Sequence, residues 1–107
     1  MSTSRKTIAQ FERIEVSQRW VRTKMSGEFV VDCKNPLLVW EHEKYPTYFF
    51  PYADVRMDWL EESARTNNRV FWHLTVNGQQ IERAAYHYLN QPDLEGYLTL
   101  SWHKVDH

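Results

Sequence analysis

A chain of 107 residues is the length of one ordinary domain, so we expect one hydrophobic core and no second domain. Hydrophobic residues make up 42% of the chain and charged residues 25%, which excludes a disordered, fibrous or membrane protein. The 13 basic and 14 acidic residues nearly cancel, so no overall positive field draws the chain to nucleic acid or to an anionic membrane. The aromatic content of 15% is high, and flat aromatic rings are suited to lining a ligand site.

The number of cysteines and the lack of long apolar segments indicate the cellular compartment of the protein. Cys33 is the only cysteine, which excludes an intramolecular disulfide and a zinc site built from several thiolates. The first ten residues contain no apolar core of a signal peptide, and no run of 18 apolar residues occurs. We therefore expect a cytoplasmic protein with neither a nucleic-acid nor a membrane partner, and without a metal or cofactor.

Residues 1–17 are predicted to form an N-terminal segment, and residues 18–107 a β domain. Within the segment, Ile8, Phe11 and Ile14 recur every three residues after a candidate cap at Ser4 or Thr7. This spacing predicts at most one short helix, over residues 4–15.

Strand-like runs separated by turn residues follow from residue 18 onward. QRWVRTKM and EFVVDC flank the Ser26–Gly27 turn and predict a hairpin. Alternation of Val55, Met57 and Trp59 predicts a further half-buried strand, and SARTNN after it predicts a polar loop. Two more strands are predicted in LLVWEHE and TYFF, which are bounded by Asn35–Pro36, Tyr45–Pro46 and Pro51.

The strongest local signal is Asn77–Gly78, because both residues tolerate the positive φ of a type I′ hairpin turn. It predicts a hairpin of RVFWHLTV with QQIERAAYHY. The expected pairs on the core face are Val76 with Gln79, Leu74 with Ile81, Trp72 with Arg83, and Val70 with Ala85. The expected pairs on the other face are Thr75 with Gln80, His73 with Glu82, and Phe71 with Ala84.

The last predicted strand is GYLTLSWHKV, with Leu98, Leu100 and Trp102 on its inward side. Together these elements predict a mainly β fold of about seven antiparallel strands, curled into a barrel-like or sandwich sheet. Strand edges in small β domains are commonly covered by self-association, so we expect a homodimer.

Four motifs occur in an order that resembles the family catalogued as domain of unknown function 427. They are SGEFVVDCKNPLLVWE, YFFPYADVRMDWLE, WHLTVNGQQIERAAYHY and GYLTLSWHKVD, and the resemblance covers about residues 18–106. The residues that match the pattern of the family are Gly27, Glu41, Tyr48, Pro51, Asp54, Val55, Trp102 and Asp106.

The resemblance implies a compact, mainly β fold with a curled antiparallel sheet, and the label of the family implies nucleotidyl transfer. Family members often carry a Cys-Pro-x-Lys-Gly segment just before the long hairpin. This chain instead has TNNR at residues 66–69, with neither the Cys nor the Lys. Any chemistry that uses those two groups is therefore absent from this segment.

A search of the sequence for known catalytic motifs gives little support to nucleotidyl transfer. There is no Gly-rich phosphate loop, since Gly27, Gly78 and Gly96 each fit a turn or the start of a strand. The spacing of Asp54 and Asp58 is common around turns and does not predict a metal site. The five histidines match no zinc motif, and a lone cysteine on a strand is typical of a small buried hydrophobe.

His73 and Glu82 are candidates for acid–base catalysis, because a carboxylate beside an imidazole raises the pKa of the imidazole. A cross-strand ion pair on the surface is the simpler interpretation of these two residues, and we favour it.

Glu41 is the third catalytic candidate. It alternates with Leu37 and Val39 and so is predicted to point inward, where a carboxylate needs hydrogen-bond donors. Tyr48 and Tyr52 are close enough in sequence to donate, as is Arg56. Structural satisfaction of Glu41 and contact with a ligand both remain open.

We predict that the domain binds a small molecule in an aromatic-lined pocket. Simple core packing is the alternative for Trp72 and Trp102, because both alternate with leucines. The other functions that stay open are a small enzyme using Glu41 and a histidine, a nucleotidyl-transfer activity, and a homo-oligomeric interaction module. The predicted ligand-binding residues are Trp40, Tyr48, Tyr52, Asp54, Arg56, Trp72, Tyr86 and Trp102.

Overall fold

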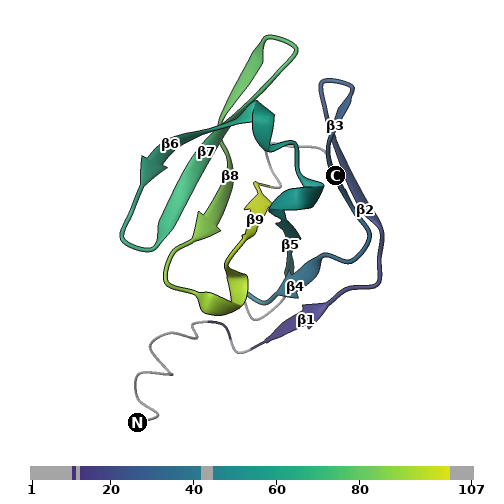
Figure 1. Ribbon diagram of the computed structural model, residues 1–107, viewed down its shortest axis with the longest axis vertical. Helices are drawn as coiled ribbons and strands as arrows, with labels where there is room; N and C mark the ends of the chain where they lie inside the picture. Colours follow the sequence, from purple (N-terminus) through teal and green to yellow (C-terminus); the bar gives the residue numbers. More distant parts are fainter. Residues whose placement is uncertain (1–10, 12, 42–44, 102–107) are drawn as a thin grey trace.

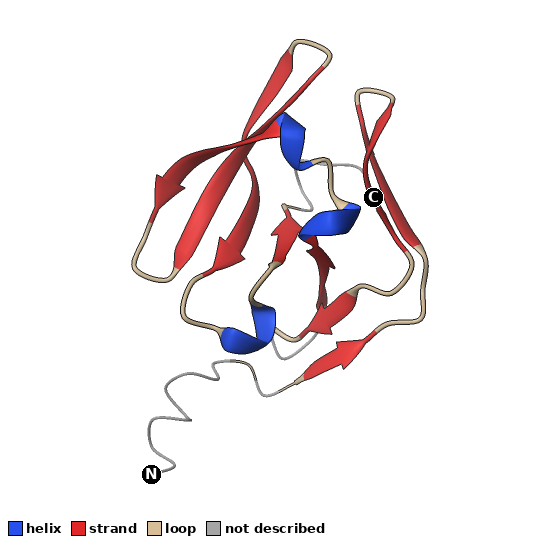
Figure 2. Ribbon diagram, in the orientation of Figure 1, coloured by secondary structure: helices blue, strands red, loops and turns tan. Residues whose placement is uncertain are grey.

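The computed structural model describes residues 11, 13–41 and 45–101. This part of the chain contains nine strands and three one-turn 3₁₀ helices (Figures 1 and 2). In chain order they are β1 (Ile14–Val16), β2 (Val21–Met25), β3 (Glu28–Cys33), β4 (Leu37–Val39), β5 (Thr47–Pro51), η1 (Tyr52–Asp54), η2 (Met57–Trp59), β6 (Leu60–Arg65), β7 (Arg69–Val76), β8 (Gln79–Tyr88), η3 (Pro92–Leu94) and β9 (Tyr97–Leu100).

Seven strands form one antiparallel sheet in the order β1-β4-β5-β9-β8-β7-β6, and β2 with β3 forms a separate two-stranded ribbon. The prediction of a mainly β domain with a curled antiparallel sheet is confirmed. Strand direction changes strongly across the large sheet, from the β6–β7–β8 hairpins to β4 and β1 (Figure 1). In the described residues no helix has the length and apolar character needed to cross a membrane.

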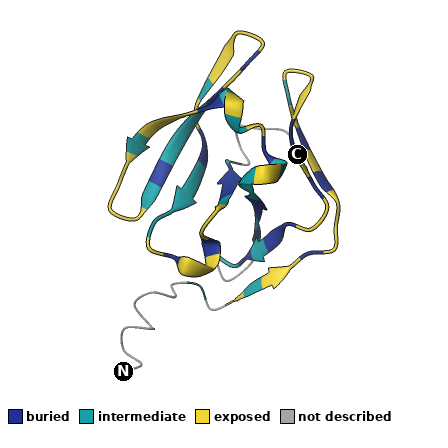
Figure 3. Ribbon diagram, in the orientation of Figure 1, coloured by how far each residue is buried: buried dark blue, intermediate teal, exposed yellow. Residues whose placement is uncertain are grey.

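The core consists of two clusters that lie on opposite faces of the central strands. Side chains of a strand alternate between the two faces of a sheet, so Phe50 joins the larger cluster and Phe49 the smaller one. The larger cluster packs the ribbon residues Val30 and Val31 against β5, β7, β8 and β9. The smaller cluster places Leu94 of η3 against Phe49 and its neighbours. Figure 3 shows buried residues concentrated in these central strands.

The described part of the N-terminal segment, residues 11 and 13–17, contains no helix, which agrees with the expectation of at most one. Residues 14–16 form β1, which pairs with β4 and aligns Ile14 with Val39. Phe11 and Ile14, two of the three apolar residues that suggested a helix, pack against the smaller cluster. Residues 1–10 and 12 lie outside the described residues.

The strand predicted at residues 55–59 is wrong, because the strand in this region begins only at Leu60. Met57 and Trp59 belong to η2, and both pack on the larger cluster from this turn. The alternation of Met57 and Trp59, which suggested a strand, is therefore produced by a 3₁₀ turn that points both side chains at the core. Residues 60–65, partly predicted to be loop, form the edge strand β6, whose exposed charges are typical of a protected sheet edge.

The Asn77–Gly78 hairpin is confirmed, but its register changes beyond Leu74. The pairs Val76 with Gln79, Thr75 with Gln80, and Leu74 with Ile81 form as predicted. A bulge around Arg83, whose φ is 53°, then shifts β8 along β7. The bulge inserts two extra residues in β8, so that both Ala84 and Ala85 are buried.

The register shift changes the predicted partners along the rest of the hairpin. It pairs Val70 with His87, Phe71 with Tyr86, and Trp72 with Ala85, in place of the predicted Val70–Ala85, Phe71–Ala84 and Trp72–Arg83 pairs.

Candidate functional site

The end of β8 meets two other segments of the chain at a hollow in the protein. After Tyr88 the chain reverses through Asn90, whose φ of 59° is left-handed, and enters η3. Leu94 anchors η3 in the smaller core cluster. The chain then passes Gly96, whose carbonyl accepts a hydrogen bond from the backbone N–H of Tyr52 at 3.0 Å. Segments from residues 52 and 87–96 are thereby held around one space.

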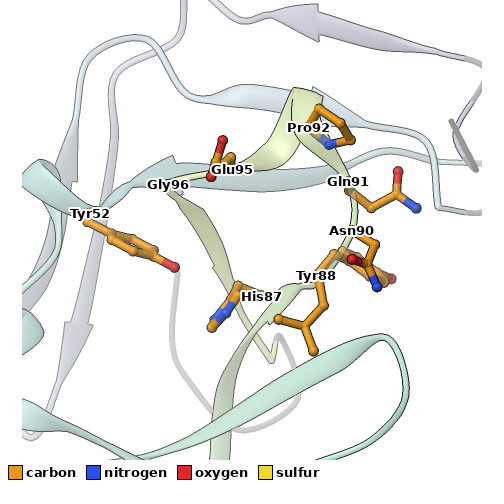
Figure 4. Close-up of a pocket in the computed structure, with 9 residues that line it drawn as sticks. Tyr52, His87, Tyr88, Asn90, Gln91, Pro92, Glu95 and Gly96 are labelled. Carbon is orange, nitrogen blue, oxygen red and sulfur yellow. The ribbon is translucent and has the colours of Figure 1, made fainter. Parts of the chain in front are cut away.

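This space is a cavity of about 550 Å³, which we call the β8–η3 cavity. Small-molecule sites in proteins commonly have volumes of about 300–1,000 Å³. The side chain of Tyr52 points across the cavity toward His87 (Figure 4). The residues that line the cavity are Tyr52, His87, Tyr88, Leu89, Asn90, Gln91, Pro92, Glu95 and Gly96.

His87 is held in one tautomer by Trp72. The indole Nε1–H of Trp72 donates a hydrogen bond of 3.0 Å to Nδ1 of His87. An indole nitrogen can only donate, so Nδ1 must accept and carries no proton. The neutral imidazole therefore has its proton on Nε2, where it is a hydrogen-bond donor.

The side chains around His87 favour uncharged forms. Burial lowers the pKa of His87 below its ordinary value of 6.5, which keeps the ring neutral near pH 7. Burial also raises the pKa of Tyr52, which stays a phenol. The two rings meet edge to face, with centroids 6.2 Å apart. This wall of the cavity thus carries aromatic surface and N–H or O–H groups without a charge.

Glu41 joins the same region through two tyrosines of β8. The hydroxyl of Tyr86 donates to the two carboxylate oxygens at 2.9 and 3.1 Å, and the hydroxyl of Tyr88 donates to Oε2. Burial, together with the charge of Glu41, raises the pKa of both tyrosines, so both remain donors. Because Tyr88 also lines the cavity, Glu41 fixes part of the cavity wall.

Arg69 lies over the rings of the same two tyrosines. Its guanidinium carbon lies 5.3 Å from the ring centroid of Tyr86 and 5.9 Å from that of Tyr88. It also lies 5.3 Å from the ring of Phe71. A cation over the face of a ring is attracted by the ring quadrupole, which helps to hold the tyrosine pair in place.

The predicted ligand-binding residues are divided among several places. Tyr52 lines the β8–η3 cavity, and Trp72 reaches it through His87. Tyr86 is hydrogen-bonded to Glu41. Tyr48 packs on the larger core cluster, whereas Tyr86 packs on the smaller one, so they face opposite sides of the sheet.

The remaining predicted residues lie away from this cavity. Trp40 packs under the guanidinium of Arg13 at 4.0 Å. Asp54 and Arg56 line a second cavity of about 350 Å³ beside β3. Arg56 also forms an ion pair of 2.8 Å with Asp58 and covers the ring of Trp59. Trp102 lies outside the described residues.

The strand register does not contain the predicted pair of His73 with Glu82. The strand register places His73 opposite Glu61 of β6, and the bulge leaves His73 without a direct register partner on β8. The hydrogen bonds described above for Glu41 come from Tyr86 and Tyr88 of β8. Acid–base catalysis by Glu41 with a histidine stays a prediction.

Sequence analysis missed His87, Tyr88 and the loop that follows them. A usable signal exists, because a histidine between two tyrosines stands just before the turn-forming Asn90 and Pro92. Within the described part of the chain, no three side chains of histidine, cysteine, aspartate or glutamate are grouped as metal ligands would be.

Comparison with known proteins agrees with the motif order seen in the sequence. No curated protein matches the chain. The sequence pattern of the family described as "Domain of unknown function (DUF427)" matches residues 13–107, which include every described strand. The chain therefore belongs to the DUF427 family.

Proposed function

We propose that this domain binds a small, planar molecule, neutral or cationic, in the β8–η3 cavity. The observation that carries the proposal is the position of His87, whose Nδ1 accepts a hydrogen bond from Trp72 and whose ring lines a cavity of ligand size. Fixed donors beside aromatic surface are the usual means by which small-molecule sites orient a ligand. Because Nδ1 already accepts a hydrogen bond from Trp72, the Nε2–H of His87 is left to donate to an acceptor atom on the ligand.

The charge of the cavity wall supports this ligand class over a phosphate compound. Its described lining includes one carboxylate, Glu95, and neither lysine nor arginine. Phosphate groups are normally held by arginine, lysine or a series of backbone N–H groups, often with a metal ion. The lining therefore gives no support to nucleotidyl transfer at this cavity. A planar ring beside Tyr52 with a carbonyl facing His87 fits the available groups.

The side-chain amides of Asn90 and Gln91 add both donors and acceptors to the lining. Glu95 supplies a negative charge that would favour a protonated amine on the ligand. These groups make a polar rim around the aromatic wall. Heterocyclic amides, free nucleobases and aromatic amines are the classes that combine the matching features.

A fragment screen by thermal shift and NMR tests the proposal. The library should pair nucleobases and nucleosides with their phosphorylated forms, with and without Mg²⁺, and should include neutral and cationic heterocycles. We expect hits among the neutral and cationic compounds, with chemical-shift changes at His87 and Tyr52. His87→Gln and Tyr52→Ala should weaken those hits about tenfold or more, as loss of a hydrogen bond or an aromatic wall does.

Tyr45→Ala is the matched control, because Tyr45 is an exposed tyrosine that does not line the cavity. It should leave the affinity of each hit unchanged. Two results would overturn the proposal. One is a screen in which no neutral or cationic compound perturbs His87, and the other is a nucleotide that binds there with Mg²⁺ while its nucleoside does not.

A further inference from the structure

The β2–β3 ribbon carries a row in which cations and aromatic rings alternate. Lys34 lies over the ring of Trp20 at 5.5 Å, and Arg22 lies over the same ring at 5.3 Å. Arg22 also covers Phe29 at 4.3 Å, and Lys24 covers Phe29 at 5.1 Å. We call these five residues the ribbon row.

Both rings of the ribbon row are unusually accessible to solvent. Trp20 is 55% exposed and Phe29 is 39% exposed, although tryptophan and phenylalanine are mostly buried in folded domains. The opposite face of the ribbon is occupied by Val30, Val31 and Cys33, which fill the larger core cluster. Core packing therefore accounts for the inner face of the ribbon and leaves the rings of the outer face unexplained.

The orientation of Trp20 is fixed before any partner arrives. Its indole Nε1–H donates to Oδ1 of Asp32 at 2.6 Å. Asp32 is also 3.8 Å from Nε of Arg22, across the strand pair. One carboxylate thus holds a ring and a guanidinium in place, and a preorganised surface loses less side-chain entropy on binding.

The near-zero net charge of the chain conceals a local asymmetry. Residues 17–35 contain four basic and two acidic residues, whereas the rest of the chain contains nine basic and twelve acidic residues. The formal net charge is therefore +2 for residues 17–35 and −3 for the rest of the chain. A local positive surface attracts a polyanion even where the total charge does not.

We propose that the outer face of the β2–β3 ribbon is a binding surface for single-stranded nucleic acid. Bases stack on exposed aromatic rings and on guanidinium planes, and phosphates pair with the neighbouring cations. The ribbon row offers all three types of group side by side. The surface is separate from the β8–η3 cavity, because none of its five residues lines that cavity.

A single strand fits this surface better than a duplex or an acidic peptide. Bases of a duplex are stacked on one another, and their faces are not available to Trp20 or Phe29. An acidic peptide would use the cations but would leave the rings without a function. The inference revises the expectation from total charge that nucleic acid is not a partner, and it requires only a short strand of a few nucleotides.

Fluorescence anisotropy with labelled single-stranded oligonucleotides of about 12 nucleotides tests the proposal. Binding at low salt should weaken as salt rises, with a slope of log affinity against log salt of about −1.4 to −2, as expected for two or three phosphate contacts. Trp20→Ala and Phe29→Ala should each lower the affinity by at least ~5-fold, because base–aromatic stacking is lost. Lys24→Gln combined with Lys34→Gln should flatten the slope.

Matched variants elsewhere on the surface serve as controls. Tyr45→Ala removes an exposed ring, and Arg65→Gln removes an exposed cation on β6. Both should bind as the unaltered protein does. His87→Gln should also leave oligonucleotide binding intact, which separates this surface from the proposed ligand cavity. Thermal unfolding of every variant confirms that it is folded.

Three outcomes would overturn the proposal. The first is the absence of oligonucleotide binding at low salt. The second is equal binding of a duplex or of polyglutamate. The third is binding that Trp20→Ala and Phe29→Ala leave unchanged in folded protein, because the attraction would then be electrostatic only.

Discussion

The β8–η3 cavity and the ribbon row use similar side chains in opposite ways. In the cavity, Trp72 donates to a nitrogen of His87, and burial keeps this nitrogen base neutral. On the ribbon, Trp20 donates to a carboxylate, and the nitrogen groups beside its ring are exposed cations. Removal from water therefore decides whether a ring and a nitrogen group form an uncharged donor site or a charged stacking surface.

The largest expected difference lies between the two carboxylates that accept hydrogen bonds from aromatic residues. Glu41→Ala leaves two half-buried phenols without their acceptor, and the free energy of unfolding should fall by about 3 kcal/mol. Asp32→Ala removes an exposed acceptor on the ribbon and should cost less than about 1 kcal/mol. Urea denaturation of both variants measures the difference.

Equal losses for the two variants would contradict the comparison. Glu41→Gln provides a further check, because its amide oxygen can accept one phenol. It should recover part of the stability lost in Glu41→Ala.

A smaller difference is expected between the two tryptophans. Trp72→Phe removes the hydrogen bond to His87 and some packing on the larger cluster, which should cost about 1–2 kcal/mol. Trp20→Phe removes a hydrogen bond at an exposed position and should cost about 0.5 kcal/mol or less. Denaturation curves in which Trp20→Phe is the more damaging change would contradict this order.

Stability should also depend on pH through His87. Because the pKa of His87 is lower in the folded protein than its ordinary value of 6.5, the unfolded protein binds a proton first as the pH falls. The contribution of neutral His87 is therefore complete above pH 6.5 and is lost as the pH falls toward the folded pKa. His87→Gln should reduce the loss of stability between about pH 7.5 and 5.5, and an unchanged pH profile would contradict the buried, neutral state.

The last prediction concerns the reactivity of Cys33 on the inner face of the ribbon. Burial, together with a hydrogen bond to Asp54, raises the pKa of Cys33 to about 11. The thiol should react with a disulfide reagent at about pH 8 at least ~100-fold more slowly in folded than in denatured protein. Rapid modification of the folded protein would show that the ribbon opens readily.

The sequence predicts local features of this fold well. Asn77–Gly78 specifies its hairpin because both residues adopt the positive φ that the turn requires, 52° and 78°. The bulge at Arg83 could not be predicted, because it depends on the fit of Ala84 and Ala85 into the larger cluster. A register error of this kind moves Tyr86 and His87 to new neighbours, and it therefore concealed the cavity.

The candidate site is predictable only in part, for a topological reason. Alternation with Leu37 and Val39 correctly indicated that Glu41 needs hydrogen-bond donors. Its donors come from β8, which lies more than 40 residues later in the chain. In the sheet, β5 and β9 stand between β4 and β8, so neither sequence proximity nor direct strand pairing indicates this contact. Sequence proximity suggested Tyr48, and only the folded structure reveals Tyr86 and Tyr88.

The state of the His87 imidazole tests the central claim most directly. Two-bond ¹H–¹⁵N correlation spectra of the folded protein at about pH 7 distinguish the two neutral tautomers and the imidazolium. We predict the Nε2–H tautomer in the unaltered protein, a mixture of tautomers in Trp72→Phe, and a shift of the Nε2 signal when a cavity ligand binds. A proton on Nδ1, or an imidazolium at this pH, would contradict the account of the cavity.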